Sequence, residues 1–254
     1  MTAVHDDYGT VAPRYYDRVY SVLRDSSGDA EFYRRLAHES GGPVLEVGCG
    51  TGRILLPIAR DGLPCTGIDA SPGMLGALRA KDPPARLRLI EAPMQDFDLS
   101  PERFALVFSA FRAFQHLYTV EDQLACLACV RRHLRPGGVF AFDVFAPALD
   151  RIATANEPEH EECRFTQDGE EVVLRTAIER DRVTQVQRVR MRWEWHRDGR
   201  LARHEQIKIR MRYYFRYELE HLLARAGFTT IDLYGGFDRR PYDYVSGETV
   251  VVAR

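Results

Sequence analysis

The feature that most constrains the fold is a short apolar run that leads into three closely spaced glycines. Residues 44–47 (Val-Leu-Glu-Val) are typical of a buried strand, and Gly48, Gly50 and Gly52 follow in the pattern G-x-G-x-G. A helical pattern begins at Ile54. Glycine adopts positive φ angles and places no Cβ between the backbone and a ligand, and a helix start presents backbone N–H groups. The segment therefore predicts a strand–turn–helix unit in which a flat polar ligand lies against bare main chain.

Four further apolar runs alternate with helical patterns around this unit. The runs cover 65–68, 87–90, 106–109 and 139–144, and the helical patterns cover 54–60, 74–79 and 121–133. Strands that alternate with helices predict βαβ units and a parallel sheet. Pro136-Gly137-Gly138 predicts a turn before the last run. The expected fold is an α/β, doubly wound domain.

A pattern with a period of two replaces this alternation from about 172 to 214. Apolar and charged residues alternate over 188–196 and again over 207–213, and Asp198-Gly199 predicts a turn between them. This predicts an antiparallel hairpin with one apolar and one charged face. The charged face is interpreted either as a solvated sheet face or as a binding surface for anions. A helix over 217–226 and strands over 229–234 and 249–253 follow.

These patterns divide the chain into three predicted parts. Residues 1–40 are helical and aromatic and form an N-terminal segment. Residues 41–147 and 215–254 form the doubly wound domain, and residues 148–214 form an antiparallel β insertion.

The composition excludes several classes of protein. With 45% hydrophobic and 11% aromatic residues the chain can bury a large core, so it is not disordered. A net charge of −2 gives no support for nucleic acid as a partner. The sequence contains no run of about 18 apolar residues, so no membrane span is predicted. Residues 1–9 lack the apolar core of a secretory signal.

The five cysteines are an odd, scattered set, which favours reduced thiols in a cytoplasmic protein. Cys126 and Cys129 are spaced C-x-x-C, but there is no second such pair to complete a zinc site. Because they fall in a helical pattern, we interpret them as core thiols and predict no metal site.

Two acidic residues flank the glycine turn. Glu46 immediately precedes it, and Asp69 ends the second predicted strand, where a carboxylate can accept hydrogen bonds from both hydroxyls of a ribose. Dinucleotide-binding enzymes have G-x-G-x-x-G, but Arg53 stands where the third glycine would fall. Glu46 would also place negative charge near a pyrophosphate. It suits a ligand with a cationic amino group instead.

With these residues in this order, the sequence resembles the class I S-adenosylmethionine-dependent methyltransferases, in particular those that methylate nitrogen in small molecules. The segment 45–52 (LEVGCGTG) matches the first motif of the family, Asp69 matches its ribose-binding acidic position, and Met74 its following hydrophobic position. The resemblance covers about 8–150 by motif and 216–254 by the order of elements. It implies a seven-stranded Rossmann-like sheet whose last strand is antiparallel.

The resemblance implies S-adenosylmethionine as the cofactor and S-adenosylhomocysteine as the product. The residues it implies around the cofactor are Glu46, Gly48, Cys49, Gly50, Thr51, Gly52, Asp69, Ala70, Met74, Met94, Gln95, Asp96, Ser109, Tyr8, Tyr16 and Tyr20. Pro93 replaces an aspartate that often binds the adenine amino group. Gln95 or Asp96 is the alternative partner for that group, while Asp96 can equally stabilise its loop. The tyrosines resemble an aromatic lid whose rings suit a sulfonium cation, with ordinary helix packing as the alternative.

The segment after the fourth strand, residues 109–117, borders the methyl group in such enzymes. A base is needed only if the acceptor arrives protonated, and histidine titrates near neutrality. His116 is therefore the candidate base, or else a residue of the pocket wall. Arg112 is the candidate substrate contact, or else a solvated arginine. Residues 239–242 either reach the same pocket or form a surface loop.

The leading hypothesis is methyl transfer from S-adenosylmethionine to a nitrogen or oxygen of a small molecule, without nucleic acid or membrane as a partner. The β insertion then caps the acceptor pocket or makes a homodimer contact. One alternative is a protein that binds S-adenosylmethionine or S-adenosylhomocysteine without catalysis. Another is an NAD(P)-dependent oxidoreductase, which the absent third glycine disfavours.

Overall fold

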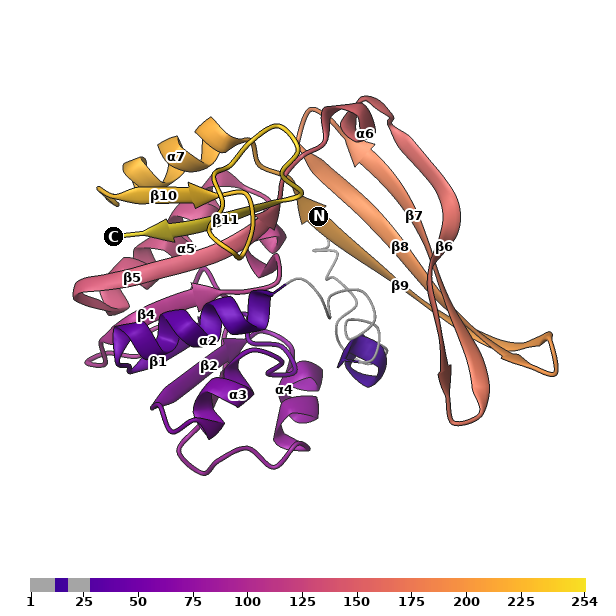
Figure 1. Cartoon of the computed structure of the whole chain (residues 1–254), viewed down its shortest axis with the longest axis horizontal. Helices are drawn as coiled ribbons and strands as arrows, with labels where there is room; N and C mark the ends of the chain where they lie inside the picture. The colour runs from indigo at the N-terminus through magenta and orange to yellow at the C-terminus, as the bar shows by residue number, and fades with distance from the viewer. Residues whose placement is uncertain (1–11, 18–27) are drawn as a thin grey trace. The chain divides into compact units, whose positions relative to one another are not determined.

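The computed structural model describes residues 12–17 and 28–254, which form two compact units (Figure 1). Of these residues, 28–147 and 213–254 make up the larger unit, and 12–17 with 148–212 make up the smaller one. Within the described residues, no helix is long and apolar enough to cross a membrane.

A seven-stranded sheet forms the centre of the larger unit. Its strands are β1 (Val44–Val47), β2 (Cys65–Asp69), β3 (Arg88–Glu91), β4 (Phe104–Ser109), β5 (Leu134–Phe145), β10 (Ile231–Tyr234) and β11 (Glu248–Ala253), in the order β10-β11-β5-β4-β1-β2-β3. Strands β1 to β5 pair in parallel, whereas β11 is antiparallel to both β5 and β10. This confirms the predicted doubly wound sheet with an antiparallel last strand.

Helices cover the two faces of this sheet. They are α2 (Asp29–Ser40), α3 (Leu55–Arg60), α4 (Pro72–Arg79), the 3₁₀ helix η1 (Ala113–His116), α5 (Val120–His133) and α7 (Arg216–Arg225). Alternate side chains of β4 point to opposite faces. Leu106 joins an apolar cluster with residues of α2, α3 and α4, while Val107 joins a second cluster with residues of α5 and α7. The sheet is therefore buried on both sides, as a parallel sheet requires.

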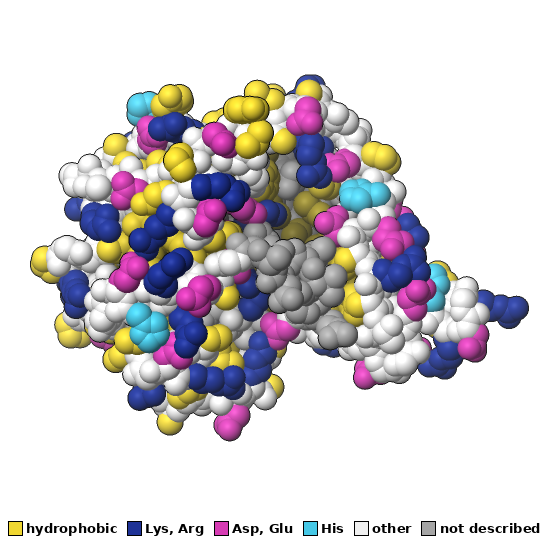
Figure 2. Space-filling model, in the orientation of Figure 1, with side chains coloured by type: hydrophobic (Ala, Val, Ile, Leu, Met, Phe, Trp, Pro, Cys, Tyr) yellow, Lys and Arg dark blue, Asp and Glu magenta, His cyan; other side chains and the backbone are white. Residues whose placement is uncertain are grey.

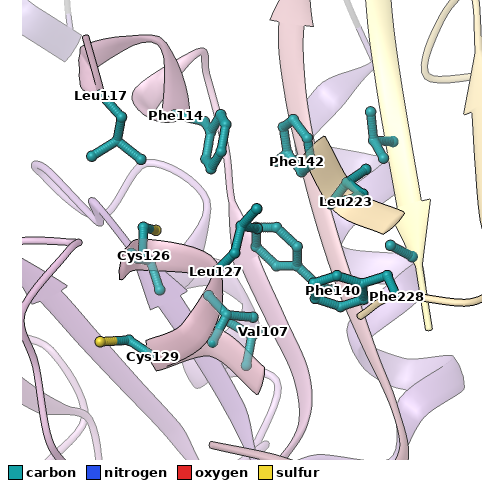
Figure 3. Packing of buried hydrophobic residues seen from close by; sticks show 14 of the residues in the cluster. Val107, Phe114, Leu117, Cys126, Leu127, Cys129, Phe140, Phe142, Leu223 and Phe228 are labelled. Atoms are coloured by element: carbon teal, nitrogen blue, oxygen red, sulfur yellow. The ribbon is translucent and has the colours of Figure 1, made fainter. Parts of the chain in front are cut away.

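The second cluster contains the C-x-x-C pair (Figure 3). Cys126 and Cys129 lie on α5 beside Leu127, and both are buried free thiols. Their interpretation as core residues is confirmed.

Two predicted boundaries differ in the larger unit. The segment Pro136-Gly137-Gly138 does not form a turn before the strand. It lies inside β5, which begins at Leu134. The pairing of β5 with β4 shifts register there, between Phe104 and Leu106, so the glycine pair marks a strand irregularity. In addition, α2 belongs to the larger unit, whereas the sequence groups it with the residues before it.

The smaller unit is a four-stranded antiparallel sheet with one short helix, α6 (Leu149–Ala153). Its strands β6 (Asn156–Gln167), β7 (Glu170–Asp181), β8 (Val186–Arg197) and β9 (Arg200–Arg212) follow in sequence order. The predicted hairpin is β8–β9, and it is confirmed. Residues 12–17 are helical, and Tyr15 packs on Trp193 and Trp195 of the apolar face, with ring centres 6.1 and 5.0 Å apart.

The opposite face of this sheet carries ion pairs. The Glu194 carboxylate lies 2.9 Å from Arg175 and 2.8 Å from Arg192, and Arg192 lies 2.7 Å from Glu159. Basic and acidic side chains are interspersed over the visible part of the unit (Figure 2). Because these charges pair within the sheet, the structure favours a solvated face over an anion-binding surface.

Candidate functional site

Three backbone hydrogen bonds shape the glycine turn after β1. The N–H groups of Gly48 and Cys49 both donate to the carbonyl of Ile68 at the end of β2, at 2.8 and 2.9 Å. The N–H of Gly52 donates to the carbonyl of Cys49 at 2.9 Å. The turn thus joins the ends of β1 and β2 and leads directly into α3.

The three glycines of the turn, all at positive φ, have different surroundings. A Cβ at Gly48 would lie 2.9 Å from the Cβ of Ala113, and a Cβ at Gly52 would lie 2.6 Å from Cδ1 of Leu78. A Cβ at Gly50 would meet nothing within 4 Å. Gly48 and Gly52 are therefore required by packing against the protein, whereas Gly50 borders space that a ligand can enter.

Glu46 brings an enclosed carboxylate to the same place. Its side chain is 3% exposed and accepts the backbone N–H of Leu55 at the start of α3, but its Oε2 has no partner among the described residues. Burial raises the pKa of Glu46 well above its ordinary value, although the charge of Arg53 opposes that shift. A buried acceptor without a donor is costly, so Oε2 is suited to a cationic N–H group of a ligand.

Asp69 is oriented by two backbone donors. Its Oδ2 accepts the N–H of Gly50 at 2.7 Å and its Oδ1 accepts the N–H of Ser71 at 2.8 Å. Burial raises the pKa of Asp69, while these two hydrogen bonds and the charge of His116 lower it. A carboxylate has about four acceptor positions, so each oxygen can accept one more hydrogen bond. That arrangement fits two neighbouring hydroxyls of a ribose.

Several implied cofactor residues contribute to the core in the structure. Met74 is buried on α4, with its N–H 3.2 Å from the capping Ser71 Oγ. The Cys49 thiol is buried, and its Sγ lies 2.8 Å from where a Cβ of Gly67 would be. Burial raises the pKa of this thiol well above its ordinary value. Both side chains are therefore part of the buried core in this structure.

Other implied residues lie along the same ends of the strands. Met94 is half-buried, with its Sδ 3.6 Å from the position of a Cβ at Gly48. The hydroxyl of Ser109, which ends β4, is enclosed and has no partner among the described residues. The remaining positions are the buried Thr51, the half-buried Gln95 and the exposed Ala70 and Asp96.

The predicted aromatic lid is described only in part. Tyr8 and Tyr20 lie outside the described residues. Tyr16 is half-buried and belongs to the smaller unit. The lid stays a prediction.

A buried aspartate that the sequence did not reveal holds the loop after β4. Phe111 and Arg112 both have positive φ, at 56° and 63°. Oδ1 of the fully buried Asp143 accepts the N–H of Phe111 and the hydroxyl of Tyr33, each at 2.8 Å, and Oδ2 accepts the N–H of Arg112 at 3.1 Å. The carboxylate thus stabilises a left-handed backbone that other residues than glycine rarely adopt.

Arg53 joins the glycine turn to this loop. Its guanidinium lies 4.8 Å from the centre of the Phe111 ring and forms an ion pair with Asp29, which is 2% exposed. The only sequence sign of these roles is an acidic residue inside an apolar run at Asp143. For Arg53 and Asp29 there is no sign beyond their charge.

The two candidate catalytic residues have different surroundings. The Arg112 guanidinium lies 2.7 Å from Oε1 of Glu248 and 5.4 Å from the centre of the Phe145 ring, so its charge is balanced within the fold. His116 ends η1 and is half-buried, and its Nδ1 lies 3.3 Å from the Tyr118 hydroxyl. Because its charge acts on Asp69, His116 belongs to the neighbourhood of the glycine turn.

Residues 239–242 form a surface loop in the larger unit. Arg239 lies 3.0 Å from Glu39, and Arg240 lies 3.5 Å from Asp238, and all four side chains are solvent-accessible. Across the described parts of the chain, His, Cys, Asp and Glu form no group of three or more that could hold a metal ion.

Comparison with known proteins identifies the central part of the chain. Residues 44–138 match the family model described as a methyltransferase domain. The chain is similar to the cypemycin N-terminal methyltransferase of a Streptomyces species, with 29% identity over 56% of this chain and 57% of that protein. It is also similar to a dTDP-3-amino-3,4,6-trideoxy-alpha-D-glucopyranose N,N-dimethyltransferase of Streptomyces venezuelae, with 32% identity over 49% of this chain and 51% of that protein. The chain thus spans about half the length of these curated relatives.

Among solved structures, the fold is similar to that of the CcbJ methyltransferase from Streptomyces caelestis. The TM-score is 0.83 with 27% identity, and the match covers 97% of each chain. The similarity therefore includes the smaller unit as well as the larger one.

Proposed function

Because the chain contains a methyltransferase domain and has the fold of the class I S-adenosylmethionine-dependent methyltransferases, we propose that it transfers a methyl group from S-adenosylmethionine to a small-molecule acceptor. Two observations carry this proposal: Oε2 of Glu46 is enclosed without a partner among the described residues, and Gly50, in the turn that follows, borders open space. An acceptor atom without a donor fits the ammonium group of the methionine part, and bare main chain leaves room for it.

The other groups fit the remainder of the same molecule. Asp69 presents two oxygens for the ribose hydroxyls, and the apolar side chain of the half-buried Met94 is proposed to pack on the adenine ring. A pyrophosphate fits less well, because Glu46 would repel it and Arg53 is already paired with Asp29. This argues against a dinucleotide as the ligand.

S-adenosylmethionine supplies a methyl group that is already activated on a sulfonium, so the protein mainly has to align donor and acceptor. Glu46 and Asp69 hold the two ends of the cofactor, and Asp143 fixes the loop of Phe111 and Arg112 that follows β4. His116 is the candidate group to take a proton from the acceptor. Arg112 is better assigned to supporting this loop through Glu248 than to binding the substrate.

A nitrogen acceptor is favoured over oxygen. The two curated relatives named above methylate an N-terminus and an amino sugar according to their names. The smaller unit is proposed to cap the acceptor or to make a homodimer contact, and residues 1–40 to contribute the aromatic lid. The proposal includes a cytoplasmic location, which the five free cysteines support.

Isothermal calorimetry with S-adenosylhomocysteine tests the cofactor, and a parallel titration that follows NADH fluorescence tests the oxidoreductase alternative. We expect saturable 1:1 binding of S-adenosylhomocysteine and none of NADH. Absence of S-adenosylhomocysteine binding at high micromolar concentration would contradict the proposal. A protein that binds it but transfers no labelled methyl group to any of a panel of small amines would be the non-catalytic alternative.

A further inference from the structure

The loop that joins β3 to β4 covers residues 92–103 and carries Met94, Gln95 and Asp96. Its first part is a tight turn, in which the N–H of Asp96 donates to the carbonyl of Pro93 at 3.2 Å. Pro93 itself has neither a backbone N–H nor a polar side chain. In the proposed function, recognition of the adenine amino group therefore depends on where this loop holds the three residues after Pro93.

The second part of the loop is anchored in the core beside α5. Phe97 and Leu99 are 4% and 5% exposed, and they share an apolar cluster with Cys129 of that helix. Asp96 and Asp98, which alternate with them, are exposed. One side of the loop is therefore buried in the core, and the other side is accessible to solvent or to a ligand.

Three side chains from the last turns of α5 form hydrogen bonds with the backbone of this loop. The bonds join the N–H of Leu99 to His133 Nε2 at 2.8 Å, the Arg132 guanidinium to the carbonyl of Phe97 at 3.0 Å, and the Cys129 thiol to the carbonyl of Gln95 at 3.7 Å. Every second residue from 95 to 99 is thus bound by the helix. The end of α5 is therefore suited to fix the path of the loop.

His133 is the most enclosed of these three side chains. Its ring is fully buried and stacks on the ring of Phe97, with centres 5.0 Å apart. Its Nδ1 lies 2.8 Å from the carbonyl of Cys129. Because a carbonyl only accepts, Nδ1 carries the hydrogen and Nε2 is left as the acceptor. The ring is therefore a neutral tautomer in one fixed orientation.

The acceptor on His133 meets one buried donor. The N–H of Leu99 donates to Nε2. Oδ1 of Asp98 lies 3.4 Å from the same nitrogen, but it accepts the N–H of Ser100 at 2.9 Å. A buried N–H without an acceptor is costly. The observed path of the loop therefore depends on an acceptor at position 133.

On the basis of the proposed function, we propose that His133 is a positioning residue for recognition of the adenine amino group. It acts through the backbone of Leu99 and holds the loop that presents Met94, Gln95 and Asp96, without touching the ligand. Hydrogen bonds weaken steeply when their angle departs from linear. A loop released from α5 would therefore still border the base but would distinguish an amino group from a carbonyl poorly.

The test compares two ligands of the full chain by calorimetry, S-adenosylhomocysteine and S-inosylhomocysteine. In the second ligand a carbonyl oxygen replaces the amino group of the purine, and the neighbouring ring nitrogen gains a hydrogen. We expect the wild type to bind S-adenosylhomocysteine about tenfold more tightly. The ratio of the two dissociation constants measures discrimination. A simple loss of folded protein weakens both ligands alike and leaves this ratio unchanged.

Two substitutions of His133 test its acceptor. His133→Phe keeps a ring that can stack on Phe97 but has no acceptor for the Leu99 N–H, so discrimination should fall to about twofold or less. His133→Gln offers a side-chain oxygen as the acceptor, and it should restore most of the discrimination. Rescue by glutamine would not be expected if the ring mattered only for packing.

Two neighbouring exposed arginines give a matched pair that does not disturb the core. Arg132 binds the loop, whereas the guanidinium of Arg131 contacts the carbonyl of Gly227. Arg132→Ala should lower discrimination about threefold, and Arg131→Ala should leave it unchanged. This pair decides the question if His133→Phe does not fold, which thermal unfolding checks.

The outcomes separate this proposal from the proposed function. If the wild type bound neither ligand, both proposals would fail. If it bound both ligands equally, or if folded His133→Phe and Arg132→Ala discriminated like the wild type, the positioning role would be overturned. The proposed function would then still stand, because S-adenosylhomocysteine would bind.

Discussion

Glu46 combines a structural and a proposed binding role in one side chain. One oxygen caps the start of α3 at Leu55, and the other is enclosed without a partner. Glu46→Gln keeps an oxygen for the cap but loses the charge. We expect S-adenosylhomocysteine to bind about 10- to 100-fold more weakly in calorimetry, because a hydrogen bond to a charged group contributes about 1.5–3 kcal/mol.

Two comparisons make that result specific. Glu102→Gln, at a half-buried residue whose carboxylate pairs with Arg88, should leave the affinity unchanged. The unfolding temperature of Glu46→Gln at pH 8 should equal or exceed that of the wild type, because a buried charge is lost. Unchanged affinity in Glu46→Gln would remove this residue from the site.

Glu46 also predicts how binding depends on pH. Since burial raises its pKa above 4.5 in the folded protein, the folded state holds this proton more tightly than the unfolded chain does. The resulting contribution to stability is present below about pH 4.5 and is lost as the pH rises through the raised pKa. A ligand ammonium group favours the ionised form of the Glu46 carboxylate. In the window between about pH 4.5 and the raised pKa of Glu46, ligand binding should therefore release a proton.

Calorimetry in two buffers measures that proton. The heat of S-adenosylhomocysteine binding should differ between phosphate and Tris at one pH in the window, and the affinity should rise with pH. Both effects should disappear in Glu46→Gln. Equal heats in the two buffers for the wild type would show that Glu46 does not change its protonation on binding.

At the scale of an element, the glycine turn allows a matched pair of substitutions. Gly50→Ala and Gly52→Ala both place a Cβ at positive φ, which costs about 1–2 kcal/mol. Only the Cβ at position 52 collides with Leu78, and overpacking adds about 1–3 kcal/mol. In urea unfolding we therefore expect Gly52→Ala to lower the free energy of unfolding clearly more than Gly50→Ala does.

Binding should show the opposite contrast. The methyl group of Gly50→Ala would occupy the open space, so we expect S-adenosylhomocysteine affinity to fall about tenfold or more while the protein remains folded. If Gly50→Ala bound the ligand like the wild type, the turn would not contact it.

Most of the elements could be predicted from the sequence because their patterns are local. The apolar runs of β1, β2 and β4 and the periodicity of α5 need only neighbouring residues to be recognised. The edge strand β6 was not predicted, because its side chains are mostly exposed and show little alternation. The glycines at 137 and 138 suggested a turn, but β5 pairs with β4 on both sides of them, at Leu134 and at Val139, so they form an irregularity within the strand.

For the whole molecule, the contacts that could not be predicted are those between residues far apart in the chain. Tyr33 and Asp143 are 110 positions apart, and the pair of Arg53 with Asp29 depends on how α2 packs. Glu46 and Asp69 could be proposed because both lie near the end of a strand and close to the glycine turn, which the local sequence shows. The lone buried Asp143 offered no such pattern.

The two compact units predict a local response to the cofactor. Glu46, Gly50 and Asp69 all belong to the larger unit. In hydrogen exchange, S-adenosylhomocysteine should slow exchange in peptides that cover 44–55 and 65–74. Peptides from the β7–β8 pairing should change much less, and protection confined to them would place the ligand in the smaller unit.

The central claim is that the turn after β1 and the carboxylates of Glu46 and Asp69 together hold S-adenosylmethionine. A crystal structure of the protein with S-adenosylhomocysteine tests it most directly. We predict the ligand amino group within hydrogen-bonding distance of Glu46 Oε2 and both ribose hydroxyls on Asp69. A nucleoside bound elsewhere, or a Glu46 oxygen that another part of the chain satisfies, would contradict the claim.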